Sequence, residues 1–239
     1  MVRVGIRMDM AATITPMTDR AGIQALLRLV TWMSPAFPVG AFSYSNGLEQ
    51  AVHDGLVTDA PGLARWLQAL IEHGSSWNDA VLLAECYSAC GDAPRLAAAR
   101  QLAEALAGSR ERHMETMLQG EAFLTAAAHW PHPVLETLTG VVAYPVAIGA
   151  VAGAHRTGLE PALAAYLHAT ASSLVSVAIR CGVMGQTQGV GVLVALEPII
   201  AETAVKASQS TLDDLGSATI TADISALRHE TLHSRLFRS

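Results

Sequence analysis

Residues 34–50 read SPAFPVGAFSYSNGLEQ and separate two stretches that have the periodicity of amphipathic helices. Proline removes a backbone donor and disfavours the α region at the residue before it, so the two prolines of this stretch end any helix that enters it. The tripeptide from Pro38 to Gly40 is typical of a tight turn. Asn46, followed three residues later by Glu49, predicts a capping box that starts the next helix. The stretch therefore predicts an ordered junction between two helices.

The composition of the whole chain favours helices over sheet. Hydrophobic residues make up 51% of the 239 residues but aromatic residues only 5%, and alanine and leucine are frequent. These side chains suit closely packed helices. No proline-, glycine- or serine-rich linker divides the chain, and its length is sufficient for one large core. We therefore predict an all-α fold, a single-domain bundle of about eight to ten helices.

Start and stop signals place most of these helices. Thr58 or Asp59 is expected to cap a helix that has proline in its first turn, and Pro94 and Ser109 are expected to start two more. The other helices are expected at residues 23–33, 77–90, 141–155, 161–182 and 186–207, with a last one from about residue 219. We assign residues 23–227 to this helical domain, residues 1–22 to a flexible, poorly ordered N-terminal arm, and residues 228–239 to a C-terminal tail that orders on docking to a partner.

Charge and hydropathy exclude several classes of function. The formal net charge is −6, and residues 31–227 hold eighteen acidic against eight basic side chains. Nucleic-acid binding needs a basic face, so a protein partner with a basic patch is expected instead. Residues 161–179 are apolar, but their serine, threonine and histidine content predicts a buried central helix rather than a membrane span. Arg180, which follows them, is expected to be buried against an acid or carbonyl groups.

The cysteines and histidines do not indicate a metal centre. The three cysteines lack zinc-ribbon spacing, which favours buried thiols in a reducing compartment. Residues 229–233 read HETLH and match the H-E-x-x-H pattern of zinc peptidases, in which His229 and His233 would bind zinc and Glu230 would act as general base. Only the six residues SRLFRS follow, and a catalytic zinc needs a third protein ligand. A zinc peptidase is therefore kept as a remote alternative.

Three motifs together resemble one known family. SPAFPVGAFSYSNGLE resembles SPxLPVGGFSYSxGLE, IRCGVMGQTQG at residues 179–189 resembles a second landmark, and RHETLHSRLFRS at residues 228–239 resembles RHETQYSRLFRS. These are signatures of the UreF family of urease accessory proteins. The sequence departs from them at Phe37, Ala41, Leu232 and His233, and the last of these changes creates the H-E-x-x-H pattern.

The resemblance implies a cytoplasmic all-α accessory protein that has no catalysis, cofactor or metal site of its own. Such a protein would bind UreD (also called UreH), form a homodimer, recruit the GTPase UreG and assist nickel delivery to the urease apoprotein. No nucleic acid or membrane is expected as a partner. Two alternatives remain open: a regulator of UreG that activates the GTPase or acts as a fidelity checkpoint, and a helical membrane or metal-storage protein.

The resemblance also implies two groups of partner-binding residues. The first is an ordered surface on the junction that would serve both UreD docking and UreG recruitment: Pro38, Gly40, Ser43, Tyr44, Ser45 and Glu49. An alternative for Pro38, Gly40 and Tyr44 is that they only shape the turn. The second is the tail, where arginine and apolar side chains are frequent interface anchors that could enter a groove of UreD: Arg235, Leu236, Phe237, Arg238 and Ser239.

Overall fold

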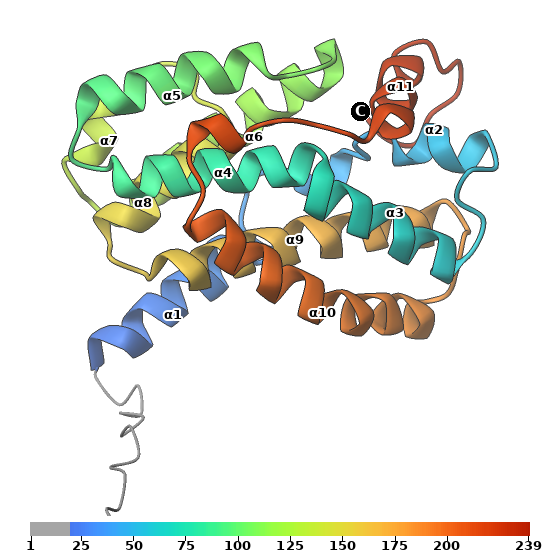
Figure 1. The fold of residues 1–239 in the computed structure, drawn as a ribbon, viewed down its shortest axis with the longest axis horizontal. Coiled ribbons are helices and arrows are strands. Elements are labelled where there is room, and N and C mark those ends of the chain that lie inside the picture. Colours follow the sequence, from blue (N-terminus) through green and yellow to red (C-terminus); the bar gives the residue numbers. More distant parts are fainter. Residues whose placement is uncertain (1–19) are drawn as a thin grey trace, which may run out of the picture.

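The computed structural model describes residues 20–239, and every regular element in this range is helical (Figure 1). The helices are α1 (Arg20–Trp32), α2 (Leu48–His53), α3 (Ala60–His73), α4 (Ser75–Ser88), α5 (Ala93–Ala105), α6 (Arg110–Ala127), α7 (Val134–Thr137), α8 (Tyr144–Ala154), α9 (Leu159–Arg180), α10 (Gln186–Ser208) and α11 (Ile220–His229). Because α7 has only four residues, the other ten are the substantial helices, which confirms the expected all-α bundle. The predicted arm, residues 1–22, lies outside the described residues except for its last three, which belong to α1.

Local capping signals set the starts of three helices as expected. The side chain of Asp59 accepts a hydrogen bond from the Gly62 amide at the start of α3. Asp92 caps α5 in the same way, and Ser109 caps α6. Each cap satisfies one of the backbone donors that a helix leaves free in its first turn.

Two helices, α4 and α8, approach closely at the centre of the bundle. Gly149 and Gly153 lie one turn apart on α8 and face the backbone of α4. A Cβ atom added at Gly149 would lie 2.4 Å from the carbonyl oxygen of Leu83, and one added at Gly153 would lie 2.2 Å from that of Tyr87. No side chain fits there, so these glycines set the distance between the two central helices.

The longest apolar stretch is the central helix α9. With 22 residues it is the one helix in residues 20–239 that is long and apolar enough to cross a membrane, and half of its most apolar window is buried inside the bundle. It packs against α10, α4, α3 and α2. The side chains that face these neighbours include Leu163, Leu167 and Leu174. Within the described residues α9 is therefore a core helix, as its small polar residues predicted.

The junction between α1 and α2 turns where expected, but α2 does not start with a capping box. Gly40 has φ +72°, consistent with a tight turn after Pro38. Asn46 and Gly47 both have positive φ, and Gly47 occupies the cap position. A Cβ atom at Gly47 would lie 2.6 Å from Cα of Ala226, so α2 begins where α11 crosses it. The capping-box prediction was wrong because the Glu49 carboxylate points to the C-terminal residues instead.

Candidate functional site: the C-terminal segment and its cradle

The C-terminal segment, defined here as residues 230–239, returns from the end of α11 to the junction in front of α2. Its end lies between the tips of α5 and α6 on one side and α2 and α11 on the other (Figure 1). The Arg238 amide donates to the carbonyl oxygen of Ser43 at 2.8 Å, and the Ser45 amide donates to that of Ser239 at 2.7 Å. The Ser45 hydroxyl also donates to Ser239 O. The segment therefore continues the fold and does not extend freely from it.

The Glu49 carboxylate holds the middle of the segment. It accepts the Leu236 amide on Oε1 at 2.7 Å and the Phe237 amide on Oε2 at 3.1 Å. Glu49 is almost fully buried. A buried carboxylate is costly unless it is paired and hydrogen-bonded, and here two consecutive amides supply much of that pairing. Glu49 therefore binds the backbone of this chain's own C-terminal segment.

His229, the last residue of α11, links three helices. Its side chain is fully buried, with Nδ1 2.7 Å from Glu111 Oε2 and Nε2 3.0 Å from Glu49 Oε2. An ionised carboxylate only accepts hydrogen bonds, so a ring nitrogen that bears a proton can donate to the acid beside it. Glu111 also pairs with Arg235 of the segment. The His229 ring thus ties α2, α6 and α11 together beneath the segment.

Phe237 anchors the segment on the end of α9. Its side chain is 3% exposed, and the guanidinium carbon of Arg180 lies 4.2 Å from its ring centroid. Arg180 also donates from Nη1 to the carbonyl oxygen of Phe42 at 2.6 Å. The expectation of a carbonyl partner for Arg180 is met, but that of burial was wrong: the residue is exposed. A guanidinium that stacks on an aromatic ring can remain solvated on its other face.

Ser239 connects the segment to a buried polar network. Its hydroxyl donates to Glu115 Oε2 at 3.0 Å, and Glu115 lies 3.4 Å from Arg112. Arg112 pairs with Asp79, whose Oδ2 also accepts the hydroxyl of Tyr166 at 2.7 Å. Burial raises the pKa of the Glu115 carboxyl, which Arg112 and the Ser239 hydroxyl partly oppose. The network therefore reaches from the segment through α6 to α4 and α9.

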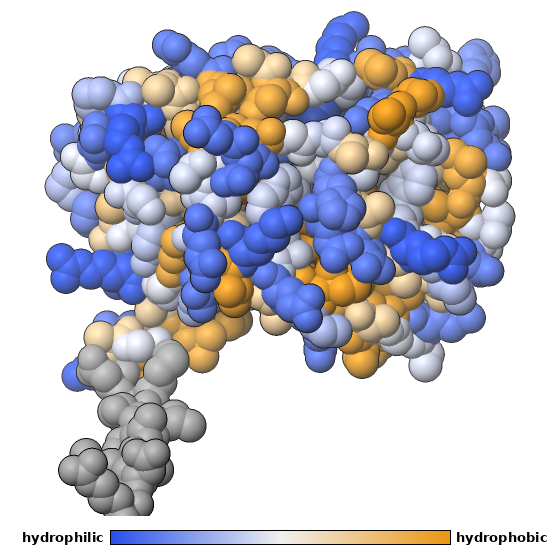
Figure 2. Space-filling model, in the orientation of Figure 1, coloured by the Kyte–Doolittle hydropathy of each residue, from blue (hydrophilic) through white to orange (hydrophobic). Residues whose placement is uncertain are grey.

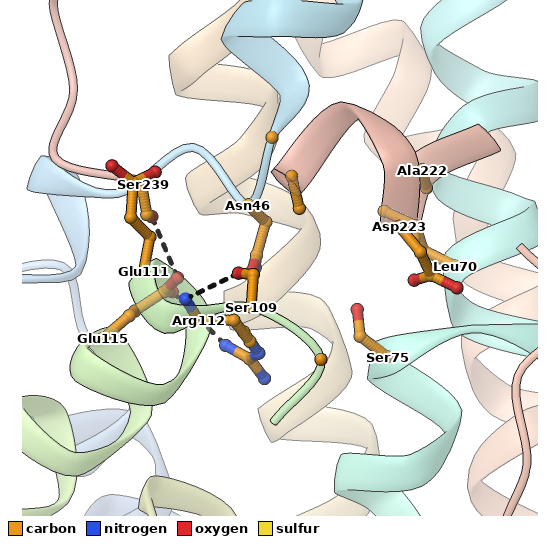
Figure 3. Close-up of a pocket in the computed structure, with 13 residues that line it drawn as sticks. Asn46, Leu70, Ser75, Ser109, Glu111, Arg112, Glu115, Ala222, Asp223 and Ser239 are labelled. Carbon is orange, nitrogen blue, oxygen red and sulfur yellow. Dashed lines mark hydrogen bonds and ion pairs between the residues drawn. The ribbon is translucent and has the colours of Figure 1, made fainter. Parts of the chain in front are cut away.

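A small cavity adjoins this network. It has a volume of about 60 Å³, room for a few water molecules. Figure 3 shows Ser239, Glu115 and Arg112 on one side of it, and Ala222, Asp223 and Ser75 on the other. Its size suits hydration of the buried polar groups rather than a cofactor.

Comparisons with known proteins agree with the three motifs. The sequence model of the UreF family matches residues 57–197. The chain is 67% identical over 223 residues to the urease accessory protein UreF of Rhizobium meliloti (strain 1021), covering 93% of this chain and 100% of the relative. It is 65% identical to that of Sinorhizobium medicae (strain WSM419) with the same coverage, and 57% identical to UreF 1 of Brucella canis (strain ATCC 23365), covering 95% and 99%. The chain belongs to the UreF family. It is accordingly a urease accessory protein and not an enzyme.

The UreF signature residues form one assembly in the fold. The junction and the C-terminal segment were expected to be two separate contact surfaces, the second of them free. Instead, Tyr44, Ser45 and Glu49 are buried against the segment, and Phe237 and Ser239 are buried against the body. Burial raises the pKa of Tyr44, whose ring lies 5.9 Å from the Arg238 guanidinium carbon. The expectation that the segment extends free of the body was wrong, because its backbone amides and Phe237 find their partners in this chain.

The remaining signature residues stay accessible at the surface. Pro38, Leu236 and Arg238 are exposed, whereas Gly40 and Ser43 are partly buried. Sequence reasoning missed Phe42, whose side chain is 70% exposed in the middle of the junction. It also missed Glu111, the acid that pairs with both His229 and Arg235. Glu111 had no signal in the sequence, because an acid in the first turn of a helix is commonly solvated.

The zinc-peptidase arrangement does not form. Helix α11 ends at His229, and His233 lies exposed in the segment beyond it, so the two histidines do not share a helix face. Glu230 Oε1 instead accepts the Arg110 amide at 2.8 Å, at the start of α6. Within residues 20–239 no group of three histidine, cysteine or acidic side chains is arranged to hold a metal ion.

Proposed function

We propose that this chain uses the outer face of α11 and the C-terminal segment to bind UreD (also called UreH), and that the junction recruits the GTPase UreG. It acts as a homodimer in the cytoplasm and assists nickel delivery to the urease apoprotein. UreG performs the GTP hydrolysis in this scheme, and the present chain supplies surfaces. Membership of the UreF family supports the general role.

The observation that carries the UreD proposal is an apolar strip along α11. Ile220, Ile224 and Leu227 lie on one helical face, and they are 69%, 48% and 50% exposed. The buried side of the same helix holds Ala222 and His229. Figure 2 shows apolar atoms at the surface over α11. An amphipathic helix whose apolar face lies in solvent is typical of helices that dock into a groove of another protein.

The C-terminal segment extends this strip with two exposed side chains. Leu236 is 64% exposed and Arg238 is also exposed, whereas Phe237 between them is buried. Leucine and arginine supply the apolar area and the charge that interfaces use. In this proposal Leu236 and Arg238 contact UreD directly. Phe237, Ser239 and Arg235 hold the segment in place.

In this proposal UreG binds the junction in the conformation that the C-terminal segment imposes on it. Phe42 is exposed, and its carbonyl oxygen accepts the Arg180 hydrogen bond, while Ser43 and Ser45 on either side of Tyr44 are bonded to the segment. Glu49 is buried beneath the segment and is not free to meet a basic patch of UreG. We therefore assign Pro38, Gly40 and Phe42 to the contact surface. Glu49 and Tyr44 act by fixing that surface.

A pull-down with UreD tests the first half of the proposal. Ile224→Asp and Leu236→Asp should each abolish co-purification with UreD, because a charge is placed in the apolar strip, while thermal stability stays at the wild-type value. Val141→Asp, at an exposed valine in the loop before α8, is the matched control. Wild-type recovery of UreD by both variants would contradict the assignment. Deletion of residues 228–239 is a poorer test, because it also removes the buried His229.

UreG binding and turnover test the second half. Phe42→Asp should lose UreG from a preformed complex with UreD while keeping UreD bound. GTP hydrolysis by UreG, measured with and without the complex, separates recruitment from regulation: unchanged turnover of bound UreG supports recruitment alone. Retention of UreG by Phe42→Asp would remove the junction from the proposal.

A further inference from the structure

The last turn of α1 is held in place by a cluster of aromatic rings. Along its 13 residues the helix buries only Leu29 and Trp32. Trp32 is fully buried, and its ring centroid lies 5.7 Å from that of Trp130 and 5.7 Å from that of His155. Its Nε1 is buried and has no hydrogen-bond partner among the described residues. Because an unpaired buried donor costs free energy, Trp32 depends on ring packing to stay in place.

The same rings support the start of the junction. The buried ring of Phe37 lies 5.7 Å from that of Phe123 and 6.4 Å from that of Trp130, measured between centroids. Phe123 also packs on Trp32, at 6.1 Å. Phe37 directly precedes Pro38, where the proposed contact surface of the junction begins. A change that loosens this ring cluster would therefore reach the end of α1 and the junction together.

His155 is the titratable ring that touches Trp32. It follows the last residue of α8 and is partly buried. Its Nε2 lies 3.3 Å from the carbonyl oxygen of Trp130, and its ring centroid lies 5.4 Å from that of His132. A carbonyl oxygen only accepts hydrogen bonds, so this contact uses a proton on Nε2 and leaves Nδ1 to take up a further one. That further proton would place a positive charge against Trp32.

The charges that act on His155 oppose such a proton. They come from Arg28 on α1 and from His132 in the loop before α7. No carboxylate of residues 20–239 forms an ion pair with any of these three side chains. Burial and then Arg28 lower the pKa of His155, whereas its bond to the Trp130 carbonyl raises it. The charged groups of the other elements near α8 are exposed or paired elsewhere: Glu85 (with Arg95), Glu121, Glu136, Arg156 and Glu160.

We propose that His155, with His132 beside it, is an acid-sensitive latch: when His155 takes up a proton, the ring cluster opens, and Trp32 and Phe37 loosen. The neutral ring supports this packing above the unperturbed pKa of about 6.5, and the support is lost as pH falls below that value. Recruitment of UreG by the junction should then weaken in mild acid. This consequence rests on the proposed function, whereas the latch itself does not.

Hydrogen exchange of the full chain at about pH 7.5 and about pH 5 tests the latch. The reporters are the amides of Met33 and Phe37, which donate to Leu29 O and Ser34 O at 2.9 Å each. After correction for the intrinsic effect of pH on exchange, their opening should increase by about threefold or more, with a ceiling of about tenfold for each pH unit below about 6.5. The amides of α9 should keep their protection. Unchanged reporters, or an equal loss of protection in α9, would overturn the proposal.

Two substitutions assign the response to His155. His155→Gln keeps a donor for the Trp130 carbonyl but cannot become charged, so the acid response of the two reporter amides should disappear. Arg28→Glu, at a partly exposed side chain of α1, gives the ring an acidic neighbour and should reduce the response. His168→Gln removes an exposed histidine of α9 and should respond like the wild type. A full response in His155→Gln or in Arg28→Glu would contradict the latch.

UreG binding in acid tests the coupling of the latch to the junction. At about pH 5.5 the wild-type complex with UreD should lose UreG, while the His155→Gln complex retains it. Equal retention by both complexes would refute the coupling. Failure of the proposed recruitment remains distinguishable: it is shown by retention of UreG by Phe42→Asp at neutral pH, whereas the reporter amides are measured without any partner.

Discussion

Glu49→Gln is the substitution that tests most directly how the C-terminal segment is held. Glutamine keeps the size of the side chain but has one acceptor oxygen in place of two. The Leu236 and Phe237 amides, which now bond to Oε1 and Oε2, can no longer both be satisfied. The new amide group would also point a donor toward His229 Nε2, which lies 3.0 Å from Oε2. The substitution therefore breaks one backbone contact and one charge contact.

The expected cost is large for a change of one atom. Removing one partner of a buried ion pair costs about 3–5 kcal/mol, and a charged hydrogen bond contributes about 1.5–3 kcal/mol. Because these effects overlap, we expect the free energy of unfolding to fall by about 3–5 kcal/mol in urea titration. For a chain of this size the melting temperature should fall by roughly 10 °C. Hydrogen exchange should show lost protection at the amides of Leu236 and Phe237.

Asp54→Asn is the matched control. Asp54 lies just after α2 and pairs with Arg228 at 3.0 Å, but the Arg228 side chain is 65% exposed. Exposed ion pairs contribute little to stability because solvent screens them, so this variant should be nearly as stable as the wild type. If Glu49→Gln and Asp54→Asn have the same stability, or if exchange at Leu236 and Phe237 is unchanged, the assigned role of Glu49 is refuted.

Three further predictions concern the body of the protein. Gly153→Ala should lower the free energy of unfolding by about 1–3 kcal/mol or more in urea titration, because the new Cβ would lie 2.2 Å from Tyr87 O. Gly91→Ala is the control: its Cβ would meet no atom within 4 Å, so its effect on stability should be nearly neutral. Asp92→Ala should lower the free energy of unfolding by about 1 kcal/mol through loss of the α5 cap, and an unchanged melting curve would contradict this. Burial, together with Glu49 and against Arg180, raises the pKa of Cys181 from 9.0 to about 11, so its alkylation should be slow at neutral pH and accelerate toward pH 11. Because folding favours the protonated form of this thiol, the stability that it contributes should be lost as pH rises from about 9 through about 11. Fast labelling of Cys181 in the folded protein at pH 7 would count against this.

The parts of the fold that could be predicted depend on interactions between residues close in the chain. Asp59 and Ser109 cap helices because each needs only an amide three residues further on. The extent of α10 followed from the glycine before it and its apolar periodicity, and the observed helix, Gln186–Ser208, differs from the predicted range by one residue. The prolines of the junction act on their immediate neighbours. These signals require no knowledge of tertiary packing.

The failures all involve partners far apart in the sequence. Asn46 and Glu49 have the spacing of a capping box, but α11 crosses the chain at Gly47. The Glu49 carboxylate instead accepts hydrogen bonds from the amides of Leu236 and Phe237, which lie 187 and 188 positions further along the chain. The spacing of residues 229–233 offered His229 as a zinc ligand in a remote alternative, but it gave no sign of the residue's actual contacts, which are on α2 and α6. One sequence contains no signal for such pairs. For the same reason the sequence alone does not show that the apolar side of α11 is exposed, because periodicity defines a face without saying what covers it.

The alternation along the C-terminal segment assigns different roles to neighbouring signature residues. Burial alternates over the last four residues, where Leu236 and Arg238 are exposed and Phe237 and Ser239 are buried. The buried pair reaches Arg180 and Glu115, so it couples the position of the segment to α9 and α6. The exposed pair has little to do with stability. A partner that binds the exposed side chains therefore also stabilises the junction, because the segment cannot leave Glu49 without leaving that partner. In this way binding at the C-terminal segment would fix the shape of the surface formed by Pro38, Gly40 and Phe42.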